Sequence, residues 1–142
     1  MDHDALAADV SRLMRDMVLL LRQATADLDV SPPQLAVLGS LLGGPRRMGD
    51  LAAEHGVRMP TMTVQVNRME RDGLVERGRD TADARVVTAS LTDTGRAALA
   101  AGRGRRNAFL AGRLAALSPE DREAIALAIP ALRLLVQGAP EE

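Results

Sequence analysis

Apolar side chains recur at helical spacing over nearly the whole chain, and this period is interrupted only once. Before Gly73 and again after Thr92, apolar residues follow the i, i+3, i+4, i+7 intervals of amphipathic helices. Between these points, segments 74–79 and 86–91 have the shorter period and the β-branched residues of strands. We therefore expect a mainly α-helical fold that contains one small β-hairpin.

Local start and stop signals divide the helical part into segments. Ser31 before a proline pair, and Ser118 before Pro119, are typical helix N-caps with proline in the first turn. Gly73 suits the left-handed position that ends a helix. Segment 80–84 is polar and turn-prone, so it joins the two strands. The expected helices are 4–28, 32–42, 49–55, 60–72, 93–117 and 119–137.

The residue types that are missing exclude several functions. Without cysteine, the chain has no disulfide, no thiolate nucleophile, no thiol redox sensor and no Cys-ligated zinc. Phe109 is the only aromatic residue, so the chain has almost no side chain on which bases could stack. Such stacking is the usual mode of single-stranded RNA binding. His3 and His55 are the only histidines and give no metal spacing. We predict no cofactor and no metal.

The absence of several motifs excludes further classes of protein. We find no nucleophile elbow and no glycine-rich phosphate loop, so we do not expect an enzyme. The chain lacks an apolar run of membrane-spanning length and begins without a signal peptide pattern. We expect a cytoplasmic protein with no membrane partner.

The formal net charge is only -1, but the charges are unevenly distributed. Residues 58–106 are basic, whereas residues 1–30 and 107–142 are acidic. A basic centre suits duplex DNA, because phosphate neutralisation dominates affinity. A compositional interpretation is also open: the chain has no Lys and is rich in Ala and Gly, as in a GC-biased genome. That bias explains the residue type but not its placement.

The order of the central segments is that of a helix-turn-helix followed by a wing. A short helix at 49–55, a tight connection and a helix at 60–72 precede the hairpin. An α-helix fits the major groove of B-DNA, and the preceding helix braces it across the backbone. The hairpin tip can then reach the adjacent minor groove, where cations are attracted.

The stretch GLVERGRDTADARVVTASLTDTG, residues 73–95, identifies a family. It resembles the wing of the multiple-antibiotic-resistance regulator (MarR) family, with Gly-Leu-Val-x-Arg, then Asp-x-Arg, then Leu-Thr-x-x-Gly. The similarity extends over residues 48–95, and the flanking helices match in length and order. Winged-helix repressors of other families differ only in the wing pattern and the helix count.

The resemblance implies one MarR-type domain over residues 1–142. Residues 31–95 would form the winged helix-turn-helix DNA-binding part, and residues 1–30 and 96–142 the dimerisation helices. The implied function is that of a homodimeric regulator, expected to be a repressor, on a pseudo-palindromic operator. The apolar stripes at both ends of the chain agree with a dimer, because a monomer would leave them exposed. The alternative is a winged-helix interaction module without specific DNA binding, against which the wing arginines argue.

Candidate DNA contacts follow from the recognition helix and the wing. Gln pairs with adenine and Arg with guanine, Thr serves bases or phosphates, and Val can touch a thymine methyl. For each helix position, the alternative is an ordinary solvated side chain. The predicted DNA-binding residues are Arg58, Thr61, Thr63, Val64, Gln65, Arg68, Arg77, Arg79, Asp83 and Arg85. The apolar residues Met62, Val66 and Met69 of the same helix are expected in the core.

The resemblance gives Asp83 and Arg85 of the wing the most specific roles in DNA binding. By resemblance, Arg85 reaches the minor groove, and Asp83 holds it through a charge-assisted hydrogen bond. The alternative is a structural pair that only stiffens the hairpin.

Family members commonly bind a small, often aromatic, anionic effector between the dimerisation and DNA-binding parts. Met14, Arg15, Met17 and Leu38 are the residues expected to line such a cleft. The alternative for each of them is plain core packing.

Overall fold

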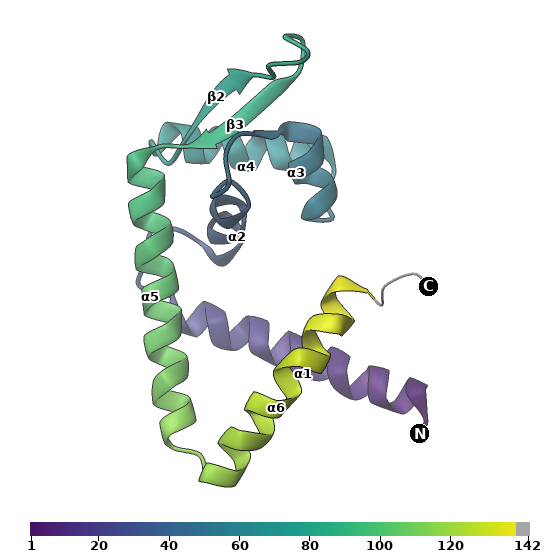
Figure 1. Cartoon of the computed structure of the whole chain (residues 1–142). Helices are drawn as coiled ribbons and strands as arrows, with labels where there is room; N and C mark the ends of the chain where they lie inside the picture. Colours follow the sequence, from purple (N-terminus) through teal and green to yellow (C-terminus); the bar gives the residue numbers. More distant parts are fainter. Residues whose placement is uncertain (139–142) are drawn as a thin grey trace. The chain divides into compact units, whose positions relative to one another are not determined.

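The computed structural model describes residues 1–138, and it confirms a mainly helical fold with a small sheet (Figure 1). The elements are α1 (His3–Ala24), α2 (Pro32–Ser40), β1 (Arg46–Arg47), α3 (Met48–Glu54), α4 (Met59–Arg71), β2 (Val75–Arg79), β3 (Val87–Leu91), α5 (Asp93–Ala115) and α6 (Pro119–Gln137). The chain forms two compact units, Met1–Arg106 and Asn107–Glu142, and each is described by itself. Among the described helices, none combines the length and the hydropathy needed to cross a bilayer.

The core of the first unit lies where α2, α3 and α4 meet the sheet. Leu38, Leu51, Met62 and Val66 are all fully buried there. Burial of a side chain of this size stabilises a fold by about 1.5–3 kcal/mol. This cluster therefore holds the three helices together as one unit beneath the exposed face of α4.

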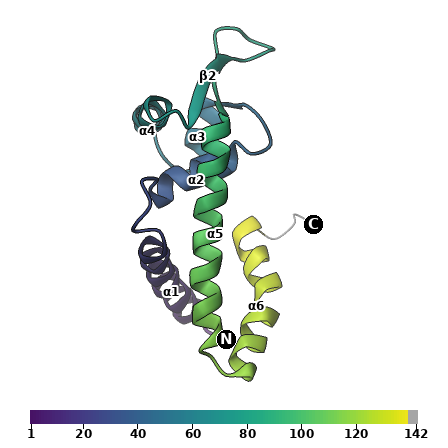
Figure 2. The same cartoon turned by 90° about the vertical axis from the view of Figure 1, so that its left-hand side faces the viewer.

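The sheet has three antiparallel strands in the order β1-β3-β2. In the hairpin, Val75 pairs with Leu91 and Arg79 with Val87. The predicted hairpin is present, and the sequence analysis did not predict β1, which adds Arg46 opposite Ala89 and Arg47 opposite Thr88. Figures 1 and 2 show the hairpin projecting beyond α3 and α4, with its connecting loop on the side away from α2.

Helix boundaries follow the expected signals. Ser31 accepts a hydrogen bond from the backbone N–H of Gln34, whose side chain accepts one from the Ser31 N–H, so α2 begins with a capping box. α4 is followed by Gly73 in the left-handed region, with φ of 74°. The first helix is shorter than predicted and ends at Ala24 instead of residue 28.

α5 packs against α2 at a position without a side chain. A Cβ atom built on Gly102 would lie 2.5 Å from a methyl group of Leu35, which is buried in the core. Nearby, the guanidinium of Arg105 pairs with Asp27. The close approach of α5 to the core of the first unit therefore leaves little room for a side chain at position 102.

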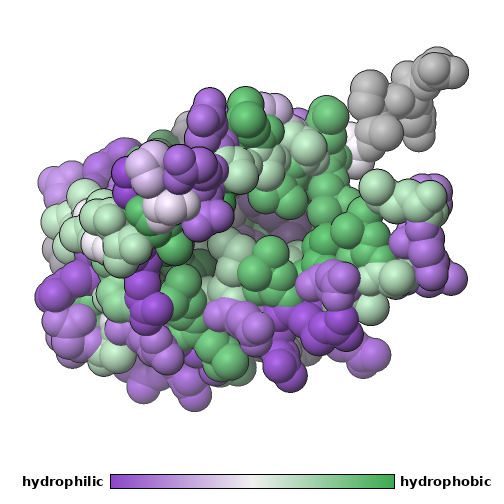
Figure 3. All heavy atoms as spheres, turned by 90° about the horizontal axis from the view of Figure 1, so that it is seen from below, coloured by the Kyte–Doolittle hydropathy of each residue, from purple (hydrophilic) through white to green (hydrophobic). Residues whose placement is uncertain are grey.

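Long apolar side chains remain at the surface of α1 and α6. α1 exposes Leu13, Met14 and Met17 among others, and only Ala24 of this helix is buried. α6 has no buried residue at all, and Val136 is 81% exposed. Apolar groups are visible at the surface in Figure 3. Such exposure in both units is unusual for a chain that acts alone.

Candidate nucleic-acid interface

α4 presents one face to the core and the others to solvent. Met62, Val66 and Met69 are fully buried, as the sequence predicted. This spacing turns Thr61, Val64 and Arg68 outward, and all three are exposed. Arg58 lies at the N-cap position just before the helix and is exposed as well.

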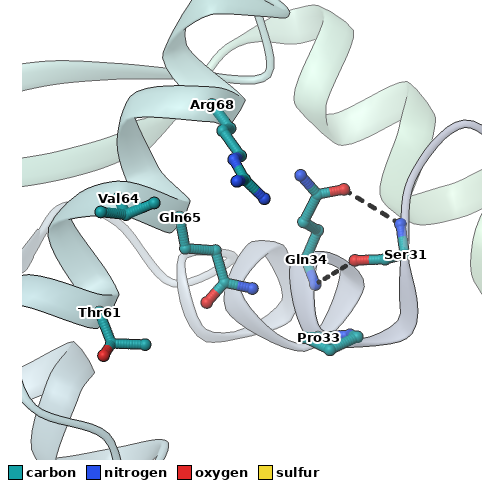
Figure 4. A pocket seen from close by; sticks show the side chains of 7 residues that line it. All are labelled: Ser31, Pro33, Gln34, Thr61, Val64, Gln65 and Arg68. Atoms are coloured by element: carbon teal, nitrogen blue, oxygen red, sulfur yellow. Dashed lines mark hydrogen bonds between the residues drawn. The ribbon is translucent and has the colours of Figure 1, made fainter.

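A first hollow of about 470 Å³ lies between α4 and the start of α2, and we call it the α2 groove. Figure 4 shows Arg68 of α4 and Gln34 of α2 extending toward one another across this space. The groove is lined by Ser31, Gln34, Thr61, Val64, Gln65 and Arg68, together with Pro33. It therefore brings together four of the predicted DNA-binding residues and three from the N-cap and first turn of α2 that were not predicted to bind DNA.

A second hollow, of about 380 Å³, separates α4 from the hairpin, and we call it the wing groove. It brings Thr63 of α4 together with Arg77 and Arg85 of the hairpin region. Apolar side chains of Met48, Met59 and Val87 form part of its wall. Arg79 lies instead in a shallow hollow beside Arg77 on β2. The predicted residues are thus distributed on α4, on β2 and on the turn that follows it.

Arg85 lies in the turn between β2 and β3, where its side chain is 91% exposed. Asp83 accepts hydrogen bonds from its Nε and Nη2 atoms, both at 3.1 Å, and from its backbone N–H at 3.0 Å. These bonds lower the pKa of the Asp83 carboxyl from its ordinary value. The predicted pairing of Asp83 with Arg85 is therefore present, and it leaves one side of the guanidinium open to solvent.

A second ion pair in the wing was missed by the sequence. Asp80 accepts bonds from Arg47 Nε at 3.1 Å and from Arg47 Nη2 at 2.9 Å. The pKa of the Asp80 carboxyl is lowered, mainly by this hydrogen bond, and the pKa of Arg47 is raised. From the sequence, Asp80 was predicted only as part of a turn, and its partner Arg47 lies 33 residues earlier in the chain. No local pattern could have revealed this contact.

The other arginines predicted to contact DNA are available to a ligand. Within residues 1–138, Arg58, Arg68, Arg77 and Arg79 form no ion pair. By contrast, Arg46 is paired with Glu54 at 3.0 Å. Unpaired arginines on an exposed helix and hairpin are suited to bind phosphate groups, since each offers five N–H donors in a fixed fork.

The residues predicted for an effector cleft differ in exposure. Leu38 is fully buried in the core of the first unit. On α1, the side chains of three residues are exposed: Met14, Arg15 and Met17. Arg15 Nη2 lies 3.5 Å from Asp16 Oδ1. For Leu38, the structure agrees with the alternative of core packing.

His55 has a local partner instead of a ligand. Its Nε2 atom lies 2.8 Å from the hydroxyl of Ser40, which also donates to Glu54 at 3.0 Å. Across the described residues, no three His, Cys, Asp or Glu side chains gather in a way that could hold a metal ion.

Comparison with known sequences gives a consistent result. The family model described as "MarR family" matches residues 28–86. An HTH-type transcriptional regulator of Mycobacterium tuberculosis is 32% identical over 142 residues, which cover 99% of each chain.

Comparison with solved structures extends this result to the fold. RV1404 from Mycobacterium tuberculosis has a TM-score of 0.83 at 23% identity, over 99% of this chain and 97% of that one. The transcriptional repressor CouR, solved on a 23-mer DNA duplex, has a TM-score of 0.73 at 26% identity. That match covers 89% of this chain and 90% of the CouR chain.

Proposed function

Because this chain belongs to the MarR family of transcriptional regulators, we propose that it is a repressor that binds an operator in duplex DNA as a homodimer. The family assignment suggested by the wing motif is confirmed, and so is the prediction that the chain is not an enzyme. Repression, the operator and the dimer are the parts that we propose.

One observation carries the proposal: the exposed side of α4 and the hairpin hold unpaired cations next to polar side chains that can bind bases. Arg58 and Arg68 lie at or on α4, and Arg77 and Arg79 on β2. Arg85 adds an exposed guanidinium in the turn between the strands. An α4 helix in the major groove would place the hairpin over the adjacent minor groove.

A homodimer is supported by the apolar surfaces of α1 and α6. A second copy would remove exposed groups such as Leu13 on α1 and Leu127 on α6 from water. Two copies related by a two-fold axis would place two α4 helices on half-sites about one helical turn apart, which favours a pseudo-palindromic operator.

Repression is supported by the similarity to CouR, a repressor solved on duplex DNA. Release by a small aromatic or anionic effector remains a prediction of the family resemblance. Leu38, one of the four residues predicted to line its cleft, is fully buried in the core.

Salt-dependent binding to duplex DNA tests the proposal. Fluorescence anisotropy with labelled duplexes from the region flanking the gene should find one that binds in preference to a scrambled duplex. Four of the predicted contact arginines, Arg58, Arg68, Arg77 and Arg79, form no ion pair within residues 1–138; four per subunit, or eight per dimer, predict a slope of about -7 in log affinity against log salt. A slope near zero on every duplex would reject DNA binding and favour the protein-interaction module instead.

A further inference from the structure

Asp80 is the residue on which the contacts of the wing turn converge. It directly follows β2, and its side chain is only 16% exposed, compared with 36% for Asp83. Its Oδ1 atom accepts from Arg47 Nε, and its Oδ2 atom accepts from Arg47 Nη2. The same Oδ2 accepts the backbone N–H groups of Ala82 at 3.1 Å and Asp83 at 3.0 Å. Four donors approach one carboxylate, which is about the number it can accept.

Arg47 ties this turn to the rest of the DNA-binding unit. It pairs with Thr88 of β3 through the backbone, and the next residue, Met48, begins α3. The bond from Arg47 to Asp80 therefore joins the wing turn to the strand that leads into the helix-turn-helix. Bidentate pairing of this kind fixes orientation as well as distance.

The contacts continue from Asp80 to the arginine that faces solvent. The backbone N–H of Asp83 donates to Asp80, and the carboxylate of Asp83 in turn accepts from Arg85. The backbone N–H of Asp80 also donates to the carbonyl of Val86 at 2.9 Å, which closes the turn around Arg85. Arg85 is thus held at the end of a continuous series of bonds that begins at Arg47.

We propose that Asp80, anchored by Arg47, is a positioning residue that sets where Arg85 is presented to DNA. This inference rests on the proposed function, because it concerns the same interface. Without the anchor, Arg85 and its loop would have to be ordered on binding. Ordering a long side chain costs about 0.5–1.5 kcal/mol, which corresponds to a loss of about two- to tenfold in affinity.

The sign of the effect distinguishes positioning from simple electrostatics. Removal of an acidic group near a polyanion should strengthen DNA binding if charge alone matters. Positioning predicts the opposite, so Asp80→Ala and Asp80→Asn should both weaken binding by about two- to tenfold. Glu76→Gln is the matched control: it removes an exposed acid from β2 of the same hairpin and should leave affinity unchanged or slightly improved.

A double-mutant cycle with Arg85 provides the second readout. In the wild-type chain, Arg85→Ala should weaken operator binding several-fold, whereas in the Asp80→Ala background it should add less than about twofold. Additive losses would overturn the inference, and so would unchanged or tighter binding by both Asp80 variants. Circular dichroism checks that each variant is folded, and Asp80→Asn, which keeps the size of the side chain, replaces Asp80→Ala if the latter unfolds.

A spectroscopic readout is independent of DNA. The ¹⁵N relaxation of the Arg85 Nε group should report greater mobility in Asp80→Asn than in the wild type, and unchanged mobility in Glu76→Gln. An equally rigid Arg85 in Asp80→Asn would contradict the inference. If the wild type binds no duplex, the proposed function fails first. If the wild type binds but the cycle shows no coupling, only the role of Asp80 fails.

Discussion

Arg85 extends into solvent while its neighbour Asp83 holds two of its nitrogen atoms. A guanidinium fixed in this way loses little freedom when it enters a narrow minor groove, where the potential of DNA is most negative. Its role in binding stays a prediction, but the geometry makes the test specific.

We expect Arg85→Ala to weaken operator binding by several-fold or more while the oligomeric state stays the same. Arg85→Lys should recover only part of the affinity, because an ammonium group keeps the charge but cannot form the paired bonds to Asp83. Gel-shift titration measures both. Arg96→Ala, which removes an exposed arginine of α5 that forms no ion pair within the described residues, is the control. An equal loss in both alanine variants would point to a general charge effect.

The two wing carboxylates have lowered pKa values, and each has a different main partner. The pKa of Asp80 is lowered first by Arg47, and that of Asp83 first by Arg85. A lowered folded-state pKa means that each ion pair stabilises the wing above the ordinary carboxyl range and is lost as pH falls through the lowered value. In ¹³C-detected titrations, Arg47→Ala should raise the midpoint of Asp80 most and that of Asp83 less, because Arg47 is the main cause of the lowered pKa of Asp80 and a minor one for Asp83. Arg85→Ala should raise mainly the midpoint of Asp83, and a larger rise for Asp80 than for Asp83 in this variant would contradict the assignment.

Two glycines of α5, two residues apart, have different surroundings. Gly102 faces the buried side chain of Leu35, whereas a Cβ on Gly104 would meet nothing within 4 Å. An added methyl group at position 102 overpacks the core at a cost of about 1–3 kcal/mol. At position 104, replacement of glycine in a helix interior stabilises by up to about 1 kcal/mol.

Gly102→Ala should therefore lower the free energy of unfolding, and Gly104→Ala should raise it. Urea denaturation of the two variants beside the wild type measures both changes. Similar gains in the two variants would show that α5 does not approach Leu35 as closely as described here.

At the level of helices and strands, the features that depend on neighbouring residues could be predicted from the sequence. The N-cap at Ser31 and the buried stripe of α4 involve residues within a few positions of one another, and cap signals and periodicity report such features directly. The pairing of Asp83 with Arg85 was implied by the resemblance of the wing motif to the family.

Contacts that join distant segments were not predictable in the same way. β1 is only two residues long and shows no period, so the third strand was missed. Its residue Arg47 meets Asp80 through the tertiary fold alone. Leu38 has the spacing of both a core residue and a cleft residue, and only the structure shows that it is fully buried.

At the scale of the whole molecule, the exposed apolar side chains of α6 predict self-association. Leu135 is 61% exposed in one copy, so Leu135→Asp should cost a lone copy little. In a dimer it would place two carboxylates against apolar surface, and the loss of two buried leucines alone is about 3 kcal/mol or more, or about a hundredfold in the dimer dissociation constant.

Sedimentation velocity should show the wild type as a dimer and Leu135→Asp as a monomer with weakened operator binding. Leu42→Asp, at a partly exposed leucine just after α2, should leave the dimer intact. A wild type that sediments as a monomer at all concentrations would contradict the dimer.

β2 lies at one edge of the three-stranded sheet, and four of its five residues are exposed. Free strand edges invite other chains to add to them, and charged side chains are one means by which soluble proteins prevent this. Arg77 and Arg79 are therefore also gatekeepers against edge-to-edge aggregation, whatever they bind. Replacing both arginines with uncharged residues would remove the positive charge from this strand edge and would therefore favour aggregation, in addition to any loss of DNA binding.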